Sequence, residues 1–273
     1  RLAAAQVEQA PAGMARHGLG VGRGDQVGHQ ARADAQLARI EAGAQPPAAH
    51  HVLARAPGAG VLHRFGSASS VVYSASSGLA VDPTELAAIR KRFAGHTVVG
   101  HVGALDNSQK AQEYIIAVAR EVRSSHPELH FVLVGGGEDE AMLKHAASGL
   151  DNITFTGFVE DVGDYLAAFD IFVLPSRREG IGSILLDAME QELPIVATRV
   201  GGVPEIVHNE ENGILIDSGH PEQLRDAVLR LSRDPALRAR MGKAGKEISR
   251  CYTAEVMAQK YLELYESAIR GRA

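Results

Sequence analysis

The stretch that decides the fold runs from Ser176 to Glu205 and reads SRREGIGSILLDAMEQELPIVATRVGGVPE. It follows an apolar run, Ile171–Leu174, whose composition is typical of a buried parallel strand. The strand leads through Pro175 into a glycine-containing loop, and a helical pattern begins after that loop. Such a junction directs backbone N–H groups and the positive end of a helix dipole toward one spot. The sequence therefore predicts a binding site for a phosphate or diphosphate at this junction.

Two acidic residues flank the junction. Glu179 precedes the expected helix, and Asp187 lies eight positions later, about two turns into it. Both side chains can therefore face one cleft, with Gly180 and Gly182 between them. Acids at a helix start often do no more than cap or solvate the helix, and this remains the alternative for each of them.

At these residues the chain resembles the retaining glycosyltransferases of family 4, which have the GT-B fold and use nucleotide-diphosphate sugars. The matching positions are Glu179, Asp187–Met189, Leu193–Thr198 and Gly201–Glu205. Asp187 stands where the family has a second Glu, so the charge is kept but the reach is shorter by one methylene. The resemblance extends from about Val98 to the C-terminus and covers only the donor-binding half of such an enzyme.

The resemblance implies roles for particular residues. Glu179 would be the catalytic residue that contacts the transferred sugar, and Asp187 would accept hydrogen bonds from the ribose diol. Lys110 would pair with the donor diphosphate, for which a compact ammonium is a natural partner, unless it is only a solvated lysine at a helix start. Ala104 stands where an Arg is common in the family, so one cation is absent; this implies either weaker binding of the diphosphate or binding that depends more on Lys110 and backbone amides. The other donor-binding positions implied are Gly103, Phe158, Gly180, Ile181, Gly182 and Ser183.

The reaction implied by the resemblance is the transfer of a hexosyl unit, with retention, from a nucleotide-sugar donor to a saccharide or lipid-linked acceptor in polysaccharide biosynthesis. No cofactor is expected, and no metal is indicated, since the histidines show no metal-ligand spacing. Neither acid need be a general base, because a diphosphate leaves readily once its charge is stabilised. One alternative is a non-catalytic nucleotide-sugar-binding remnant, since no acceptor domain is recognisable in this chain. A third alternative is an interaction domain that uses the C-terminal helix.

Composition and charge exclude several other classes. With 273 residues, 45% hydrophobic and 22% charged, the chain is typical of an α/β protein with one or two cores. A net charge of −5 leaves no basic footprint for nucleic acid. The single cysteine, Cys251, excludes an intrachain disulfide and a cysteine cluster for zinc. The chain shows neither a signal-peptide pattern nor an apolar run of the roughly 20 residues that a membrane span needs, so we expect a cytoplasmic location, with peripheral membrane association left open.

Residues 1–70 differ from the remainder. They contain seven Arg, no Lys and four acidic residues, and Phe65 is their only aromatic residue. This Ala/Gly/Arg-rich segment lacks the apolar bulk that a core requires. It is either a disordered or partly helical extension or a wrong-frame translation that ends near Val71. We expect it to add no ordered strand to the main sheet, and we take 71–273 as the nucleotide-sugar-binding domain.

From Val71 onward, strands and helices alternate in the manner of a doubly wound, Rossmann-like parallel sheet with six or seven strands. Asp82-Pro83 followed by Glu85 marks a helix start. His101 lies in an expected strand and is predicted to be packed rather than catalytic. Strands are expected at 71–73, 97–102, 131–134, 153–155, 171–174, 195–197 and 214–216, and helices at 109–122, 140–147, 162–168 and 254–269, with first-turn prolines at Pro221 and Pro235.

Overall fold

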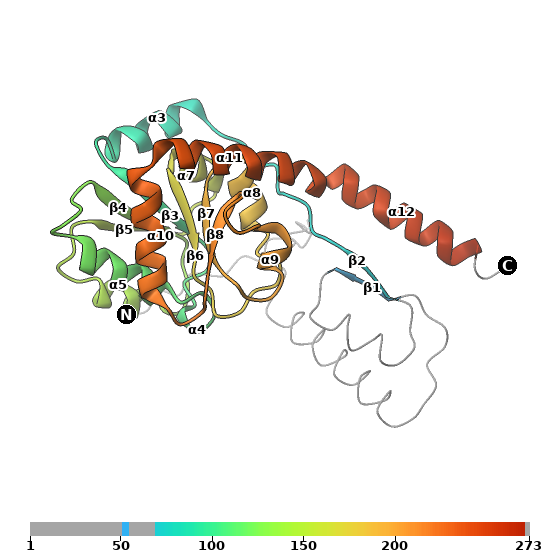
Figure 1. The fold of residues 1–273 in the computed structure, drawn as a ribbon, viewed down its shortest axis with the longest axis horizontal. Coiled ribbons are helices and arrows are strands. Elements are labelled where there is room, and N and C mark those ends of the chain that lie inside the picture. Colours follow the sequence, from blue (N-terminus) through green and yellow to red (C-terminus); the bar gives the residue numbers. More distant parts are fainter. Residues whose placement is uncertain (1–50, 55–68, 271–273) are drawn as a thin grey trace, which may run out of the picture. The chain divides into compact units, whose positions relative to one another are not determined.

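The computed structural model describes residues 51–54 and 69–270 of the chain. Its main feature is a six-stranded parallel sheet in the order β5-β4-β3-β6-β7-β8 (Figure 1). The predicted doubly wound α/β fold is thereby confirmed. The strands are β3 (Thr97–Val102), β4 (Leu129–Val134), β5 (Ile153–Gly157), β6 (Ile171–Leu174), β7 (Ile195–Thr198) and β8 (Gly213–Ile216).

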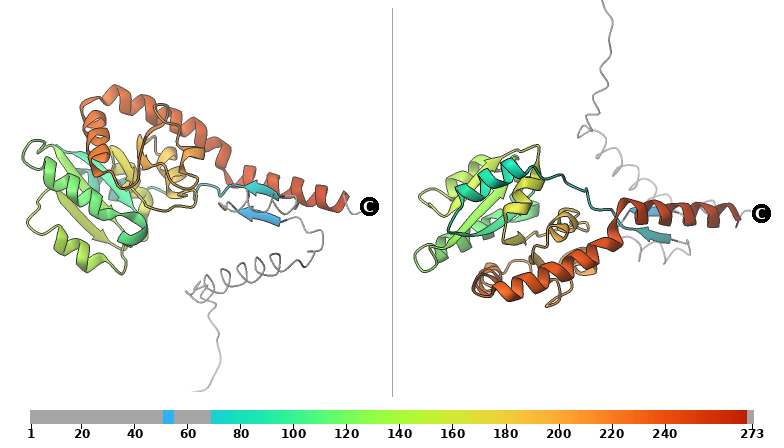
Figure 2. Two further views of the ribbon diagram at one scale, coloured as in Figure 1. Left: turned by 60° about the horizontal axis from the view of Figure 1, so that its bottom comes forward. Right: turned by 90° about the horizontal axis from the view of Figure 1, so that it is seen from above.

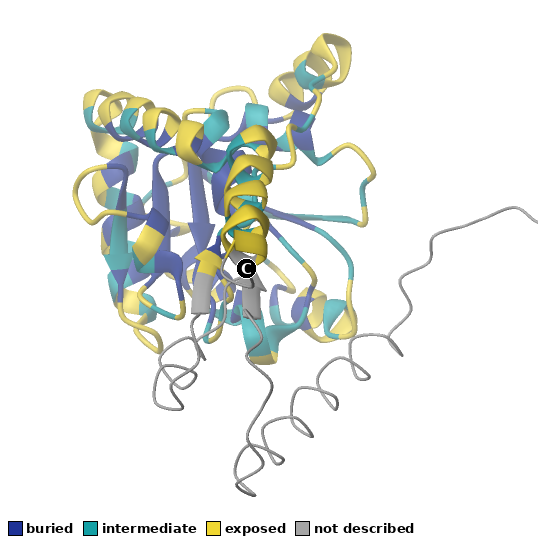
Figure 3. Ribbon diagram, turned by 90° about the vertical axis from the view of Figure 1, so that its right-hand side faces the viewer, coloured by how far each residue is buried: buried dark blue, intermediate teal, exposed yellow. Residues whose placement is uncertain are grey.

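Helices cover both faces of this sheet (Figures 1 and 2). One buried cluster joins the sheet to α3 (Pro83–Arg92), α7 (Val162–Ala168), α8 (Ile184–Glu190) and α9 (Val203–Ile206). The other joins it to α5 (Gln112–Val122), α6 (Glu140–Ala146), α10 (Pro221–Arg233) and Met241 of α11 (Pro235–Ser249). Successive residues of β6 alternate between the two clusters, as the two-residue period of a strand requires. The strands are accordingly buried while the outer sides of the helices are exposed (Figure 3).

Local signals in the sequence explain where several helices begin. The side chain of Asp82 accepts hydrogen bonds from the backbone N–H groups of Thr84 and Glu85, so it caps α3 as predicted. Pro221 and Pro235 occupy the first positions of α10 and α11, and Asp234 caps α11. After a short 3-10 turn, η1 (Arg250–Tyr252), the chain ends in α12 (Ala254–Arg270), whose residue Tyr265 is exposed.

One predicted helix is divided in two. The sequence predicts a continuous helix over 109–122, whereas the structure has α4 (Asn107–Lys110) followed by α5. The break is at Ala111, a fully buried residue with a left-handed backbone (φ 54°). That conformation costs about 1–2 kcal/mol for a residue with a Cβ, so tertiary contacts must impose it. The break separates the partly buried Lys110 at the end of α4 from the fully buried Gln112 at the start of α5.

A second, two-stranded sheet pairs β1 (His51–Ala54) with β2 (Ser69–Val72) in parallel register, with His51 opposite Ser69. Among the described strands, β1 pairs with β2 alone and does not join the six-stranded sheet. No pattern in the sequence predicted β1. The other predictions for residues 1–70 fall almost entirely outside the described residues.

Candidate nucleotide-sugar site

The candidate site lies where the order of the strands reverses. From β3 the chain continues through β4 and β5 toward one edge of the sheet, whereas from β6 it continues through β7 and β8 toward the other. β3 and β6 are neighbours, so their carboxyl ends form the switch point of the sheet. Open α/β sheets bind ligands in the crevice at such a point. Gly103 follows β3 and Pro175 follows β6, so both predicted loops begin there.

Lys110 and Glu179 form an ion pair across this switch point. Both side chains are shielded, with 18% of Lys110 and 6% of Glu179 exposed. Glu179 also accepts a hydrogen bond of 2.8 Å from the Ser176 hydroxyl. A Cβ at Gly103 would lie 3.9 Å from the Cε atom of Lys110, so the glycine lies beside the lysine stem. The structure therefore brings together three residues that the sequence predicted separately: Gly103, Lys110 and Glu179.

Arg177 ties the two loops of the site together, a role that the sequence analysis did not identify. Its backbone N–H donates to the carbonyl of Gln109 (2.8 Å), and its guanidinium donates to the carbonyl of Asn107 (2.5 Å). The guanidinium also pairs with Glu113 and lies 4.8 Å from the ring centre of Tyr114. The loop after β6 is thus held against α4. The only sequence signal was the position of Arg177 inside the signature loop.

A buried hydrogen-bond network lies beneath the loops. The Nδ1–H group of His101 donates to the carbonyl of Val173 (3.0 Å), which leaves Nε2 to accept from the Gln112 amide (3.3 Å). The same amide donates to the carbonyl of Ala104 (2.8 Å), so the network supports the loop after β3. Burial lowers the pKa of His101 to about 4, because the imidazolium would lose its hydration. The imidazole is therefore neutral near pH 7, and the prediction of a packed histidine is confirmed by its complete burial.

The glycine turn after β4 packs against the loop after β3. A Cβ at Gly135 would lie 2.1 Å from the carbonyl oxygen of Gly103, and one at Gly137 would lie 2.5 Å from that of Leu105. Close packing of the backbone therefore accounts for both glycines. Phe158 follows β5 beside this turn, and 80% of it is exposed. An exposed aromatic ring at the rim of the site is available to contact a planar group.

The loop from Gly180 to Ser183 is held by the glycine pair that follows β7. Gly202 donates a backbone hydrogen bond to the carbonyl of Gly180 (2.8 Å). Gly201 has φ of 55°, and a Cβ there would lie 2.0 Å from the carbonyl oxygen of Glu179. The two motifs of the signature thus meet through their backbones. Ile181 is buried and packs into the core, while Gly182 has φ of 69° and precedes α8.

Asp187 is placed differently from the expectation. It lies in the first turn of α8, not two turns into the helix, because the helix begins only at Ile184. Only 4% of the residue is exposed, and its two oxygens accept hydrogen bonds from the Ser77 backbone N–H (2.6 Å) and hydroxyl (3.2 Å). Burial raises the pKa of Asp187, and the hydrogen bonds from Ser77 partly oppose that rise. The acid predicted to bind ribose thus has partners within the chain.

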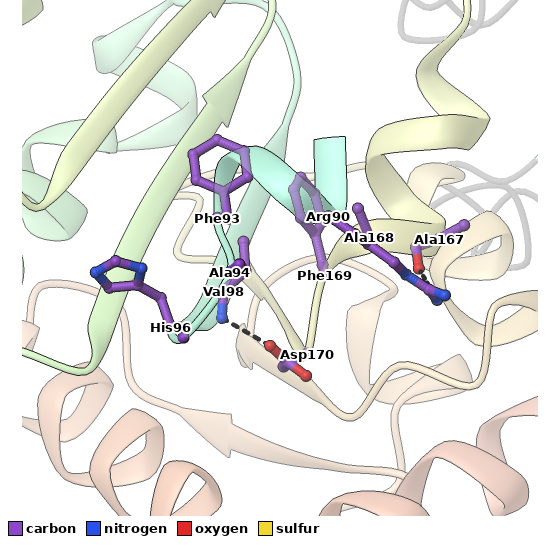
Figure 4. Close-up of a pocket in the computed structure, with 10 residues that line it drawn as sticks. Arg90, Phe93, Ala94, His96, Val98, Ala167, Ala168, Phe169 and Asp170 are labelled. Carbon is purple, nitrogen blue, oxygen red and sulfur yellow. Dashed lines mark hydrogen bonds between the residues drawn. The ribbon is translucent and has the colours of Figure 1, made fainter. Parts of the chain in front are cut away.

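A pocket of about 270 Å³ lies at the opposite end of the strands (Figure 4). His96 precedes β3 and Asp170 precedes β6, so this pocket is at the amino ends of the strands. Asp170 accepts from the backbone N–H of Val98 (2.8 Å), and Arg90 donates to the carbonyl of Ala167 (3.0 Å). These contacts tie neighbouring elements to one another. Because the pocket lies at the amino ends of the strands, it is separate from the Lys110–Glu179 pair at their carboxyl ends.

The geometry places the domain in the class of open, doubly wound α/β domains, with the candidate site at the switch point of the sheet. Within that class, the chain belongs to the family described as glycosyl transferases group 1, whose family model matches residues 96–234, just over half of the chain.

Relatives and a solved structure agree with this family. The chain is 28% identical over 174 residues to N-acetyl-alpha-D-glucosaminyl L-malate synthase of Bacillus anthracis, covering 62% of this chain and 45% of the relative. It is 29% identical over 202 residues to a GDP-mannose-dependent monoacylated alpha-(1-6)-phosphatidylinositol monomannoside mannosyltransferase of Corynebacterium glutamicum, covering 69% and 52%. The chain thus spans about half the length of these relatives.

The structure of Anabaena Alr3699/HepE in complex with UDP matches with a TM-score of 0.71 at 22% identity, covering 79% of this chain and 63% of that one. This likeness confirms the predicted fold, that of the C-terminal domain of GT-B glycosyltransferases. Within residues 51–54 and 69–270, no helix is both long and apolar enough to cross a membrane.

Proposed function

We propose that this chain is the donor-binding half of a retaining family 4 glycosyltransferase, which moves a hexosyl unit from a nucleotide-diphosphate sugar to a saccharide or lipid-linked acceptor. The names of two similar proteins support a nucleotide donor, since one is GDP-mannose-dependent and the other was solved with UDP. The observation that carries the proposal is the shielded Lys110–Glu179 pair at the switch point of the sheet.

The pair is suited to a diphosphate donor for an electrostatic reason. In the ligand-free chain, the ammonium of Lys110 and the carboxylate of Glu179 balance each other's charge. A bound diphosphate offers Lys110 a stronger anionic partner, and Glu179 can then accept hydrogen bonds from the sugar hydroxyls. The pair thus places the cation for the leaving group next to the acid for the sugar.

The proposed reaction breaks the bond between the anomeric carbon and the diphosphate oxygen, and the diphosphate keeps the electron pair. Lys110 and the backbone amides from Gly180 to Ser183 stabilise the charge that develops there, so we propose that no metal is needed. The acceptor hydroxyl forms the new bond through its oxygen on the face that the diphosphate leaves, and its proton passes to the departing diphosphate oxygen, so the anomeric configuration is retained.

Transfer requires more than the donor site. Holding an acceptor about 3–3.5 Å from the reacting carbon can supply roughly 7–11 kcal/mol of barrier reduction. In two-domain enzymes, closure around the donor also excludes water that would hydrolyse it. Because the chain spans about half the length of its relatives, we expect it to bind nucleotides weakly and not to transfer sugar by itself.

Calorimetric titration with UDP, GDP and ADP tests the binding step. Lys110→Ala should weaken binding by about 1–3 kcal/mol, because a charge-assisted phosphate contact is lost. Lys144→Ala is the matched control, since Lys144 pairs with Glu140 on an exposed helix. Equal affinity in the Lys110 variant and the parent chain would show that Lys110 does not contact the bound nucleotide.

A labelled nucleotide-sugar, with a membrane extract as the source of acceptor, tests the transfer step. We expect no transfer by the present chain, and transfer by a version that also carries an acceptor domain. Glu179→Ala in that longer version should abolish transfer, whereas Glu192→Ala, at an exposed surface pair with Lys246, should not. Robust transfer by the present chain would show that the donor half is sufficient.

A further inference from the structure

The segment between β2 and α3, Tyr73–Asp82, crosses the domain as a strap that is fastened at several points. Near its end, the backbone N–H of Asp82 donates to the carboxylate of Asp164 (2.6 Å). Near its start, the backbone N–H of Ser76 donates to the carbonyl of Tyr252 (2.8 Å), and the hydroxyl of Tyr73 donates to Glu205 (2.5 Å). We call residues 73–82 the strap.

The middle of the strap is fastened to α8 by two neighbouring serines. Ser77 donates its backbone N–H and its hydroxyl to the two oxygens of Asp187, while the hydroxyl of Ser76 donates to Glu190. Asp187 and Glu190 are three residues apart on the helix, so they share one face. Gly78 comes next, with a left-handed backbone (φ 61°) and open space where a Cβ would be. The chain can therefore turn away from the helix directly after Ser77.

The contact with Ser77 conflicts with the role that the family resemblance implies for Asp187, which is to bind the ribose diol of the donor. A ribose diol presents two hydroxyl donors, and Ser77 presents the same number, one N–H and one O–H, to the same carboxylate. Because only 4% of Asp187 is exposed, ligand hydroxyls have little access to its oxygens while Ser77 remains in place. Exchanging one pair of donors for another leaves no acceptor unpaired, so the exchange avoids the main cost of breaking a buried hydrogen bond.

We propose that the strap is a latch: Ser77 occupies Asp187 in the ligand-free protein and releases it when the ribose diol of the nucleotide donor binds. This inference rests on the proposed function, because it requires a nucleotide at this site. The latch couples donor binding to the segment that joins the domain to the chain before it. It also makes the diol, rather than the base or the phosphates, the part of the donor that frees the strap.

The latch has a thermodynamic consequence. If the strap competes with the nucleotide for Asp187, the observed dissociation constant equals the intrinsic one divided by the fraction of molecules that are unlatched. By linkage, weakening the contact between Ser77 and Asp187 must strengthen nucleotide binding. If the strap had only a structural role, weakening this contact would instead weaken nucleotide binding, because it would disorder α8.

Amide hydrogen exchange and calorimetry together test the latch. With UDP or GDP bound, the Ser77 amide should exchange faster than in the free chain, and the matching 2′,3′-dideoxy nucleotide should bind without this change. Ser77→Ala should bind the ribonucleotide about two- to tenfold more tightly, the range expected for removing one competing hydrogen bond. Ser232→Ala, which removes a hydroxyl bonded within α10, should bind like the parent chain.

The outcomes separate the two proposals. If none of UDP, GDP and ADP binds, the proposed function fails, and the latch fails with it. If a nucleotide binds while the Ser77 amide keeps or gains protection, the latch is overturned and the donor site stands. Equal or weaker binding by a folded Ser77→Ala protein would overturn the latch as well. If that variant does not fold, the exchange rate of the Ser77 amide in the unaltered chain still tests the latch: equal rates with the ribonucleotide and the dideoxy nucleotide would overturn it.

Discussion

Acidification should destabilise this domain through His101. The imidazole is fully buried and its pKa in the folded chain is about 4, whereas an unfolded chain has the ordinary value of about 6.5. Between these values the unfolded state binds a proton that the folded state does not, so stability falls as the pH falls. The stability is fully present above pH 6.5 and is lost as the pH falls toward 4. At about 1.4 kcal/mol per pH unit, lowering the pH from 7.5 to 4.5 should cost about 2.5 kcal/mol from this one group.

The variant His101→Asn isolates that contribution. An Asn amide can still donate to the carbonyl of Val173 in place of Nδ1–H, but it has no proton to gain. Urea unfolding at pH 7.5 and pH 4.5 should therefore show a pH-dependent loss about 2.5 kcal/mol smaller than in the parent chain, even if the variant is less stable at both values.

Two further histidines serve as comparisons for this measurement. Burial is also the main cause that lowers the pKa of His130 to about 4, but this ring is only half-buried. Water on its exposed side screens the charge, so His130→Asn should reduce the pH dependence by less than His101→Asn. His145→Asn, at an exposed position on α6, is the control. If His101→Asn kept the whole pH dependence of the parent chain, the argument from its burial would be wrong.

Four other substitutions test the packing of the domain by their effect on the free energy of unfolding. Asp82→Ala removes the cap of α3 and should cost about 1 kcal/mol in urea unfolding. Gly242→Ala should cost about 1–3 kcal/mol or more, because its Cβ would lie 1.8 Å from the backbone oxygen of Glu192. Gly245→Ala should cost less, because the nearest contact of its Cβ, at 3.2 Å, is the flexible side chain of Met189. Equal costs for the two variants would contradict this interpretation. Arg177→Lys keeps the charge but not the planar fork, so we expect a loss of about 1 kcal/mol and faster amide exchange in the loop after β6; unchanged exchange would show that Arg177 does not hold that loop.

The sequence by itself determined the elements whose cause is local. The bounds of β3 and β6 were predicted correctly, because central parallel strands are buried on both faces and are therefore mostly apolar, without interruption in β6 and with only Thr97, Gly100 and His101 as exceptions in β3. The starts of α3 and α11 were also predicted, since capping acids and first-turn prolines act on their immediate neighbours. Glu179 and Gly201 could be identified as candidate site residues because both lie in the one stretch of chain, residues 176–205, that carries the family signature.

Only the tertiary structure decided what depends on contacts between distant segments. The break at Ala111 contradicts local propensity, which favours a continuous helix, and burial of the residue imposes it. The ion pair of Lys110 with Glu179 joins residues 69 positions apart, and the contact of Ser77 with Asp187 spans 110 positions. No local pattern encodes such pairings, because they follow from the order in which the strands are placed in the sheet. The sequence thus named the acids of the site, whereas their partners became visible only once the sheet had brought distant segments together.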